Sequence, residues 1–486
     1  MKERFELLEK AILTMVEDKK YATLRDILVT MNPADIAGIF NSMELEDKRI
    51  PLMFRLLPKE LAAETFVEME PEDQEMLIRG FSDNELKEVL DELYVDDAVD
   101  IVEEMPANVV RRILSNIDPE MRQSINQILR YPENSAGAWM TTEYVSLRPG
   151  MTVEEAILRI RRQGVDKETI YTCYVTKDRT LLGIVTVKDL LLAEDDEMLI
   201  SDMMETDLIY VTTHTDQEEV ARIFSKYDFI ALPVVDTEKR MVGIVTVDDA
   251  IDVMEEEATE DIELMGGMLP SEDTYLRSSV WELFKNRIPW LLFLMLSATF
   301  TSMIINSFES ALAAQAALTA FIPMLMGTGG NSGSQSSVTI IRALSLDEVE
   351  FADLPKVVWK EIRTAVLCGL ALAIVCFGKI WLVDKLLMGN EDISLLVDAV
   401  VCFIKIWLVD RLLFGNPDIS LMVDAVVCLA MFVTVLLAKT VGAVLPMVAK
   451  IMKLDPAVMA SPFITTIVDA LSLLIYFRFA TMLLGI

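Results

Sequence analysis

Residues 461–477 read SPFITTIVDALSLLIYF, an apolar run of membrane character with one carboxylate, Asp469, near its middle. An aspartate at bilayer depth costs about 2.5–3.5 kcal/mol on insertion scales, so its side chain is expected to face a cavity or a partner rather than lipid. Thr465 and Thr466 precede it by less than two turns and offer hydroxyls that orient the carboxylate or hold water beside it. This stretch therefore predicts a polar site inside a membrane domain.

A second unusual stretch lies in the same half of the chain, where residues 323–335 read PMLMGTGGNSGSQ. Four glycines in an otherwise apolar segment make a poor regular helix. Free backbone carbonyls are tolerated at membrane depth only where they line water or protein. We therefore expect an interrupted helix here, and an interrupted helix beside an embedded acid is typical of a cation path.

Hydropathy predicts five membrane spans, at residues 288–305, 311–341, 365–383, 422–445 and 457–484. Lysine and arginine lie before the first span, between the second and third, and between the fourth and fifth, but not between the first and second. Basic loops favour the cytoplasmic side, so the N-terminus is expected inside and the C-terminus outside.

A tandem duplication complicates this topology, because residues 376–401 are repeated as 402–427 with identity at 21 of 26 positions. Residues 393–413 are long and apolar enough to suggest a sixth span, but they carry Asp398, Lys405 and Asp410. A sixth span would also move the last basic loop outside. We favour an outer-face hairpin or lengthened helix ends.

The charge is concentrated in the front half, where 61 of the 77 acidic side chains but only 29 of the 43 basic ones precede Trp281. Such a surface disfavours nucleic acid as a partner and favours cations, with solubility as the alternative explanation. The five cysteines and the single histidine have no metal-ligand spacing, so neither zinc nor a disulfide framework is expected. No signal peptide opens the chain, which predicts a cytoplasmic front half.

Residues 1–133 carry repeated helix starts of the Asn-Pro or Asp-Pro kind and predict a stacked helical superhelix. Residues 134–253 instead show strand pairs, with GIVTV occurring at both 183–187 and 243–247. This internal repeat resembles a tandem pair of cystathionine-β-synthase-type (CBS) domains, in which Asp189 and Asp249 hold the motif's aspartate position.

An acidic helix is expected to continue from the second copy into residues 254–280. At 100° per residue, one helix face within about 80° collects four carboxylates, those of Asp249, Asp252, Glu256 and Glu260. Asp96 and Asp100 form a similar pair in the helical domain. Oxygen-only clusters suit Mg²⁺ or Ca²⁺, and a solvated acidic face is the alternative in both places.

Together these parts resemble the MgtE family of magnesium channels and transporters, through the motifs at 323–335 and 462–469 and the run EATED at 257–261. The resemblance implies a homodimer in the lipid bilayer with a pore on its two-fold axis. Asp469 of each subunit would bind hydrated Mg²⁺, with Gly327, Asn331 and Ser334 bordering the pore. A structural acid capped by Thr465 or Thr466 is the alternative, and Asp424 ranks second as an embedded acid.

For the cytosolic part, the resemblance implies regulatory Mg²⁺ sites at Asp96, Asp100, Asp249, Asp252, Glu257, Glu260 and Asp261. The helical stripe favours Glu256 where the family match favours Glu257, and the choice stays open. The family resemblance also implies ATP as a regulatory ligand of the CBS pair, at Tyr174, Lys188 and Asp189.

The expected protein is thus multidomain and mainly α: a helical N-domain (1–133), an α+β CBS pair (134–253), an acidic connecting helix and linker (254–280) and a polytopic membrane domain (281–486). Its expected function is Mg²⁺ uptake across the plasma membrane, closed by cytosolic Mg²⁺. Transport of Mn²⁺, Co²⁺ or Ca²⁺ is the alternative. An enzyme is not expected, because the glycine-rich stretch lacks Gly-Lys-Ser/Thr and no nucleophile elbow is present.

Overall fold

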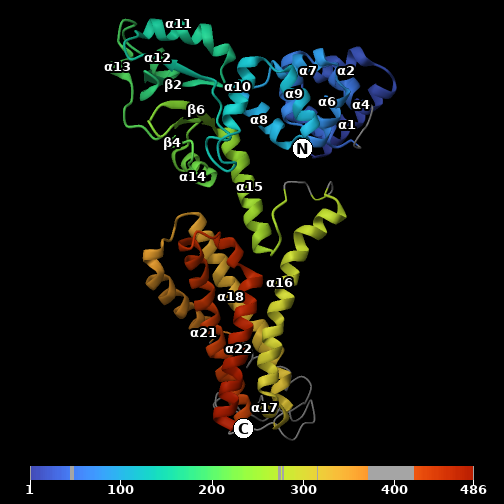
Figure 1. Ribbon diagram of the computed structural model, residues 1–486, viewed down its shortest axis with the longest axis vertical. Coiled ribbons are helices and arrows are strands. Elements are labelled where there is room, and N and C mark those ends of the chain that lie inside the picture. The colour runs from blue at the N-terminus through green and yellow to red at the C-terminus, as the bar shows by residue number, and fades with distance from the viewer. Residues whose placement is uncertain are drawn as a thin grey trace, which may run out of the picture. The chain divides into compact units, whose positions relative to one another are not determined.

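The structure is a computed structural model that describes residues 2–43, 49–271, 275, 278–314, 316–369, 371 and 421–484. The chain divides into two units, Met1–Glu255 and Glu256–Ile486. Figure 1 shows the helical and mixed elements of the first unit and the long helices of the second.

The first unit begins with short helices whose starts match the sequence signals. Asn32 accepts a hydrogen bond from the Ala34 amide, and Ser82 forms a capping box with Glu85, so the orphan amides of these helix ends are satisfied. Alternate helices pack on one another, α3 on α5, α5 on α7 and α7 on α9, as a helical stack requires. The bounds are α1 Lys2–Glu17, α2 Tyr21–Leu28, α3 Pro33–Asn41, α4 Arg49–Phe54, α5 Lys59–Val67, α6 Pro71–Gly80, α7 Asp83–Leu90, α8 Val95–Glu104, α9 Ala107–Asn116 and α10 Pro119–Ile128.

The predicted sequence repeat folds as two three-stranded sheets with orders β1-β2-β3 and β4-β5-β6. In each sheet the first pairing is parallel and the second antiparallel. The strands are β1 Tyr144–Leu147, β2 Thr169–Lys177, β3 Thr180–Thr186, β4 Val211–Thr212, β5 Ala231–Val235 and β6 Met241–Thr246. The helices are α11 Val153–Gln163, η1 Gly164–Asp166, α12 Val187–Leu191, α13 Ile200–Met203 and α14 Gln217–Tyr227.

The two copies are joined by exchanged backbone pairing. The Thr141 amide, at the opening of the first copy, donates to the Ile244 carbonyl in β6 at 2.8 Å. The Ile184 amide in β3 donates to the Glu205 carbonyl, at the opening of the second copy, at 3.0 Å. Each opening segment thus pairs with the last strand of the other copy, and the two copies fold as a pair.

The acidic helix predicted after the second copy is α15, Val247–Met265, a continuous helix of 19 residues. Its residues up to Glu255 belong to the first unit and the later ones to the second. Leu264 and Met265 at its end pack with Ile341, Ala457 and Ala460 of the second unit.

The second unit consists of long apolar helices. Among the described residues, three helical stretches are long and apolar enough to cross a membrane: Val280–Ser307, Leu429–Ile451 and Pro456–Leu484. Most of the predicted third span, 365–383, and the duplication up to residue 420 lie outside the described residues. The elements are α16 Val280–Ser307, α17 Glu309–Ala314, η2 Ala316–Phe321, α18 Ile322–Ser345, η3 Phe351–Asp353, a helical stretch at 354–369, α21 Leu421–Ile451, η4 Pro456–Met459 and α22 Ser461–Leu484.

The glycine-rich stretch is not interrupted, so the predicted break is wrong: α18 runs through it as one helix of 24 residues. Helices α18, α21 and α22 pack together (Figure 1), and the glycines provide the close approach. A methyl group on Gly329 would lie 2.8 Å from Thr434 Cγ2, and one on Gly442 would collide with the Gly333 carbonyl. Gly329 and Gly333 therefore form a Gly-x-x-x-Gly packing face, whose tight contacts outweigh glycine's poor helix propensity.

Candidate functional site

Asp469 lies on α22, at the third turn of a mostly apolar helix whose other charged residue is Arg478. Its side chain is partly buried, and within the described part of the chain it has no hydrogen bond or ion pair. Thr465 and Thr466 do not orient it, because both hydroxyls donate to the Pro462 carbonyl, at 2.9 and 3.1 Å. The carboxylate is thus left available, and capping by the two threonines is not what holds it.

The second predicted part of the site is one face of α18. Gly327 and Asn331 are exposed and Ser334 is partly buried, and all three lie on the face that α21 and α22 leave uncovered. Nothing lies within 4 Å of a methyl group built on Gly327, in contrast to the packed glycines. A polar, glycine-bearing stripe on a membrane helix is costly against lipid, and it suits a water-filled path.

Helix register brings these two parts to the same level. α22 runs opposite to α18, because Gly333 contacts Ile464 while Gly329 contacts Val468 and Ser472. Thr465 lies against Gly330, so one further turn along α22 places Asp469 at the height of Gly327. The unpartnered acid and the exposed polar stripe therefore belong to one region of the membrane unit.

A second group of carboxylates gathers in the first unit. α8 contributes Asp96, Asp97 and Asp100, and the start of α15 contributes Asp248 and Asp249. Two further acids come from the first CBS copy, Glu143 before β1 and Glu168 before β2.

Burial and mutual repulsion raise the pKa of five acids of this group, Asp96, Asp97, Asp100, Asp249 and Glu168. Burial, followed by the charge of Asp249, raises the pKa of Asp96, whose buried Oδ1 has no hydrogen-bond partner among the described residues. Burial and Asp97 raise the pKa of Glu168 to about 8, and burial outweighs the Thr246 hydrogen bond to raise that of Asp249 to about 7. The pKa of Asp100 is also raised, first by desolvation from surrounding protein atoms and then by the charge of Asp249. Part of this residue nevertheless stays exposed to solvent. Burial and the neighbouring carboxylates therefore both disfavour the ionised forms of these five acids.

The structure brings together Asp96, Asp100 and Asp249 of the predicted set. Asp252 is exposed, and desolvation with Asp248 raises its pKa. Among the described residues, no three acidic, histidine or cysteine side chains are arranged to grip a bare metal ion. Carboxylates spaced more widely than direct ligands suit an ion that keeps its water shell, as Mg²⁺ does.

The remaining predicted acids, Glu257, Glu260 and Asp261, lie on the part of α15 that belongs to the second unit. Asp261 accepts a hydrogen bond from Ser345 Oγ, at the end of α18, at 3.5 Å. Glu256 and Glu257 both lie on α15, Glu256 exposed and Glu257 partly buried, so the choice between them stays open.

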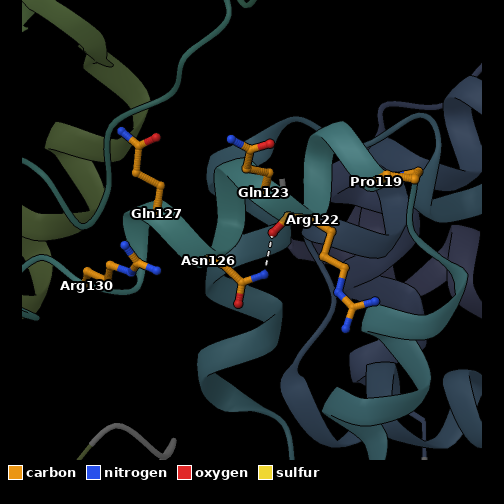
Figure 2. A pocket seen from close by; sticks show the side chains of 6 residues that line it. All are labelled: Pro119, Arg122, Gln123, Asn126, Gln127 and Arg130. Atoms are coloured by element: carbon orange, nitrogen blue, oxygen red, sulfur yellow. Dashed lines mark hydrogen bonds between the residues drawn. The ribbon is translucent and has the colours of Figure 1, made fainter.

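The predicted nucleotide residues are differently accessible. Tyr174 is fully buried against Tyr144, with ring centroids 5.7 Å apart, whereas Lys188 and Asp189 are exposed. Asp189 caps α12 by accepting hydrogen bonds from the Thr186 amide and hydroxyl. A surface hollow elsewhere in the first unit is lined only by α10 and the turn after it (Figure 2), with arginines and amides directed outward. It contains no predicted site residue.

The sequence reasoning missed four acids of the first-unit group. Asp97 and Asp248 are direct neighbours of predicted acids, and this doubling was a usable signal. Glu143 follows the Met-Thr-Thr opening of the first copy, where its Oε2 accepts from the Val95 amide at 3.1 Å. Glu168 has no local signal, because only the pairing of β1 with β2 brings it there.

Comparison with known proteins agrees with these features. The sequence profile of the MgtE family, described as a divalent cation transporter, matches residues 322–479, the MgtE intracellular N domain matches 31–134, and CBS domains match 136–196 and 200–256. The magnesium transporter MgtE of Thermus thermophilus is 36% identical over 95% of both chains, and that of Bacillus subtilis is 30% identical over 97% of this chain and 96% of its own. A crystal structure of the cytosolic domain of the Mg²⁺ channel MgtE with ATP is 38% identical, covers 50% of this chain and 99% of its own, and has a TM-score of 0.48. The predicted resemblance is confirmed, and the chain belongs to the MgtE family.

Proposed function

We propose that this protein transports Mg²⁺ across the plasma membrane into the cell. The relatives that match nearly the whole chain are named magnesium transporters. The observation that carries the proposal is Asp469, a carboxylate on a membrane helix without a partner in the described structure, level with the exposed polar face of α18. A carboxylate and polar oxygens beside water can hold a hydrated dication without stripping its water shell.

A second copy of the chain completes the path in this proposal. The face of α18 that carries Gly327, Asn331 and Ser334 is uncovered by the described helices of its own chain. A homodimer in the lipid bilayer would place two such faces and two Asp469 side chains around a two-fold axis. The proposed topology keeps five spans in residues 281–486, with residues 1–280 in the cytoplasm and the C-terminus outside.

The carboxylates of the first unit are proposed to sense cytosolic Mg²⁺. Asp96, Asp100 and Asp249 lie close enough for their ionised forms to repel one another, and Asp96 is buried. A hydrated cation among them relieves this repulsion and favours a compact arrangement. Loss of the cation favours a looser one, and metal bound more tightly to the closed state would shift the population toward closure.

The later acids of α15, Glu257, Glu260 and Asp261, are proposed to carry this change to the pore. Asp261 already contacts Ser345 at the end of α18, and Leu264 and Met265 pack beside it. Because α18 also carries the polar face of the path, an ion held by these acids would bias the position of α18.

Nucleotide regulation by ATP at the CBS pair is proposed as a further layer. Lys188 and Asp189 are the accessible residues of the predicted set, and they lie at the start of α12 after a repeated GIVTV strand. The Lys188→Ala variant is expected to weaken ATP binding, measured by calorimetry on the full-length protein. Unchanged affinity would remove Lys188 from the proposed site.

Transport is tested with the purified protein in liposomes that contain a fluorescent Mg²⁺ indicator. Asp469→Asn keeps the side chain's size but removes its charge, and is expected to lower Mg²⁺ influx about tenfold or more, since a charged ligand contributes more than 1.4 kcal/mol. Asp347→Asn, at the exposed turn after α18, is the matched control and should retain influx. Equal influx in the wild type and Asp469→Asn would refute the proposed path.

The same liposomes decide between Mg²⁺ and the alternative cargoes Mn²⁺, Co²⁺ and Ca²⁺. Mg²⁺ influx is measured with each of the three other ions added at equal concentration, and the degree of inhibition ranks the ions by their affinity for the path. A stronger effect of Mn²⁺, Co²⁺ or Ca²⁺ at equal concentration would favour a transporter for that cation.

A further inference from the structure

A lysine is buried inside the membrane unit. Lys439 on α21 is 4% exposed, and its ammonium donates a hydrogen bond to Ser336 Oγ on α18 at 3.3 Å. Ser336 is 2% exposed and donates in turn to Glu361 Oε2, on the helical stretch 354–369, at 2.6 Å. One hydroxyl therefore connects a buried cation with a partly buried anion across three helices.

The depth of this lysine makes it costly. Lys439 precedes Lys450, at the end of α21, by 11 positions, which corresponds to roughly 16 Å along a helix at about 1.5 Å per residue. Lys439 is 4% exposed and does not reach water as Lys450 does, whose side chain is 44% exposed. An ionisable side chain inside a membrane domain is expensive, so a contribution to function is the default expectation.

The three groups do not lie on the proposed ion path. Ser336 follows Asn331 by five positions, which is about 140° around the helix at 100° per residue. Its face is the one that packs on α21, next to the contact of Gly333 with Gly442. Lys439 and Glu361 both bond Ser336 Oγ, so they meet α18 on this face and not on the face of Asn331.

The glycine contacts bring α18 close to α21 and α22, and the polar contacts of Ser336 add a directional constraint to this packing. A hydrogen-bonded cation and anion on two neighbouring helices fix one rotation and one register. A one-residue slip of α18 would separate Ser336 from both partners and leave the buried ammonium of Lys439 without this hydrogen bond, which is costly for a buried charge.

We propose that Lys439, Ser336 and Glu361 form a buried charge relay that locks α18 against α21 and so positions the polar face of Asn331 and Ser334 along the ion path. These are positioning residues for transport, and the inference rests on the proposed function of that path.

The test compares Mg²⁺ influx of Lys439→Met, Lys439→Arg, Glu361→Gln and the double variant Lys439→Met/Glu361→Gln in liposomes, over a range of Mg²⁺ concentrations. Each single neutralisation leaves the other charge without its partner and should raise the half-saturating Mg²⁺ concentration about tenfold or more, because the path's ligands move. Lys439→Arg and the double variant should recover to within about threefold, since neither leaves an unpaired charge. Lys453→Met, at the exposed turn after the same helix, is the control.

A purely structural role predicts a different pattern, in which the single variants lower the maximal influx through loss of folded protein while the half-saturating concentration stays unchanged. That pattern, or a double variant as impaired as the singles, would overturn the inference. If Lys439→Met is not recovered as folded protein, the double variant decides: folded and active supports the relay, whereas unfolded or inactive opposes it. The Asp469→Asn variant tests the transport function independently of Lys439 and Glu361. A negative result for the relay therefore does not contradict the proposed transport function.

Discussion

Glu168→Gln should stabilise the protein near neutral pH, although the substitution removes a charge from a strongly charged unit. In the folded chain burial and Asp97 raise the pKa of Glu168 to about 8, from an ordinary glutamate value of 4.5. At pH 7 the folded carboxyl retains a proton that the unfolded chain releases, which costs at most about 3 kcal/mol. Residual solvent contact reduces this, so we expect a gain of about 1–2 kcal/mol in the free energy of unfolding, or roughly 2–8 °C in Tm.

The sign of this effect depends on pH. Because the folded pKa is raised, the penalty is absent below about pH 4, grows as pH rises toward about 8 and then stays constant. Thermal unfolding of the full-length protein in detergent should therefore show a larger Tm gain at about pH 8 than at about pH 5. Mg²⁺ should stabilise Glu168→Gln less than the wild type, since part of the repulsion is already gone. Glu194→Gln, at an exposed site of the same CBS copy, is the control. A Tm at or below that of the wild type at pH 8, or a gain independent of pH, would refute the proposed repulsion.

Three further results are expected. Gly442→Ala should destabilise the membrane unit by about 1–3 kcal/mol, because the added methyl group meets the Gly333 carbonyl, and the measurement is a lower Tm. Gly327→Ala is the matched variant: nothing lies within 4 Å of its added methyl group, so it should keep the wild-type Tm but alter Mg²⁺ influx. Mg²⁺ should protect the cytosolic carboxylate region against proteolysis at about pH 8 and protect it less at about pH 5, where these raised-pKa acids are protonated; equal cleavage with and without Mg²⁺ would contradict metal sensing. Ser82→Ala should cost about 1 kcal/mol, read as a Tm shift, because it removes the capping box of α7.

Local signals predicted most of the elements of the first unit. Proline and capping residues marked the starts of α3, α7 and α10, because an N-cap satisfies amides within its own first turn. The verbatim repeat GIVTV predicted two equivalent strand-to-helix units, and the structure has them at β3–α12 and β6–α15. These interactions span only a few residues, so the sequence contains the information directly.

The glycine-rich stretch is the instructive failure. Helix propensity predicted a break between Pro323 and Gln335, but α18 continues through it because Gly329 and Gly333 are covered by α21 and α22. Propensity describes an isolated helix in water, where glycine exposes backbone and gains entropy on unfolding. In a packed membrane bundle the absence of a side chain instead permits close helix contact.

The sequence by itself determined the membrane half, the CBS repeat, the acidic front half and the identity of Asp469 as an embedded acid, because hydropathy, repetition and charge are readable without a partner. Only the tertiary structure decided which acids share a site, since Glu168 reaches Asp97 and Asp249 through strand pairing and not through sequence proximity. It also decided that Lys439 meets Ser336 across 103 positions of chain. The physical reason is that repulsion and burial depend on distances across the fold, which no local pattern specifies.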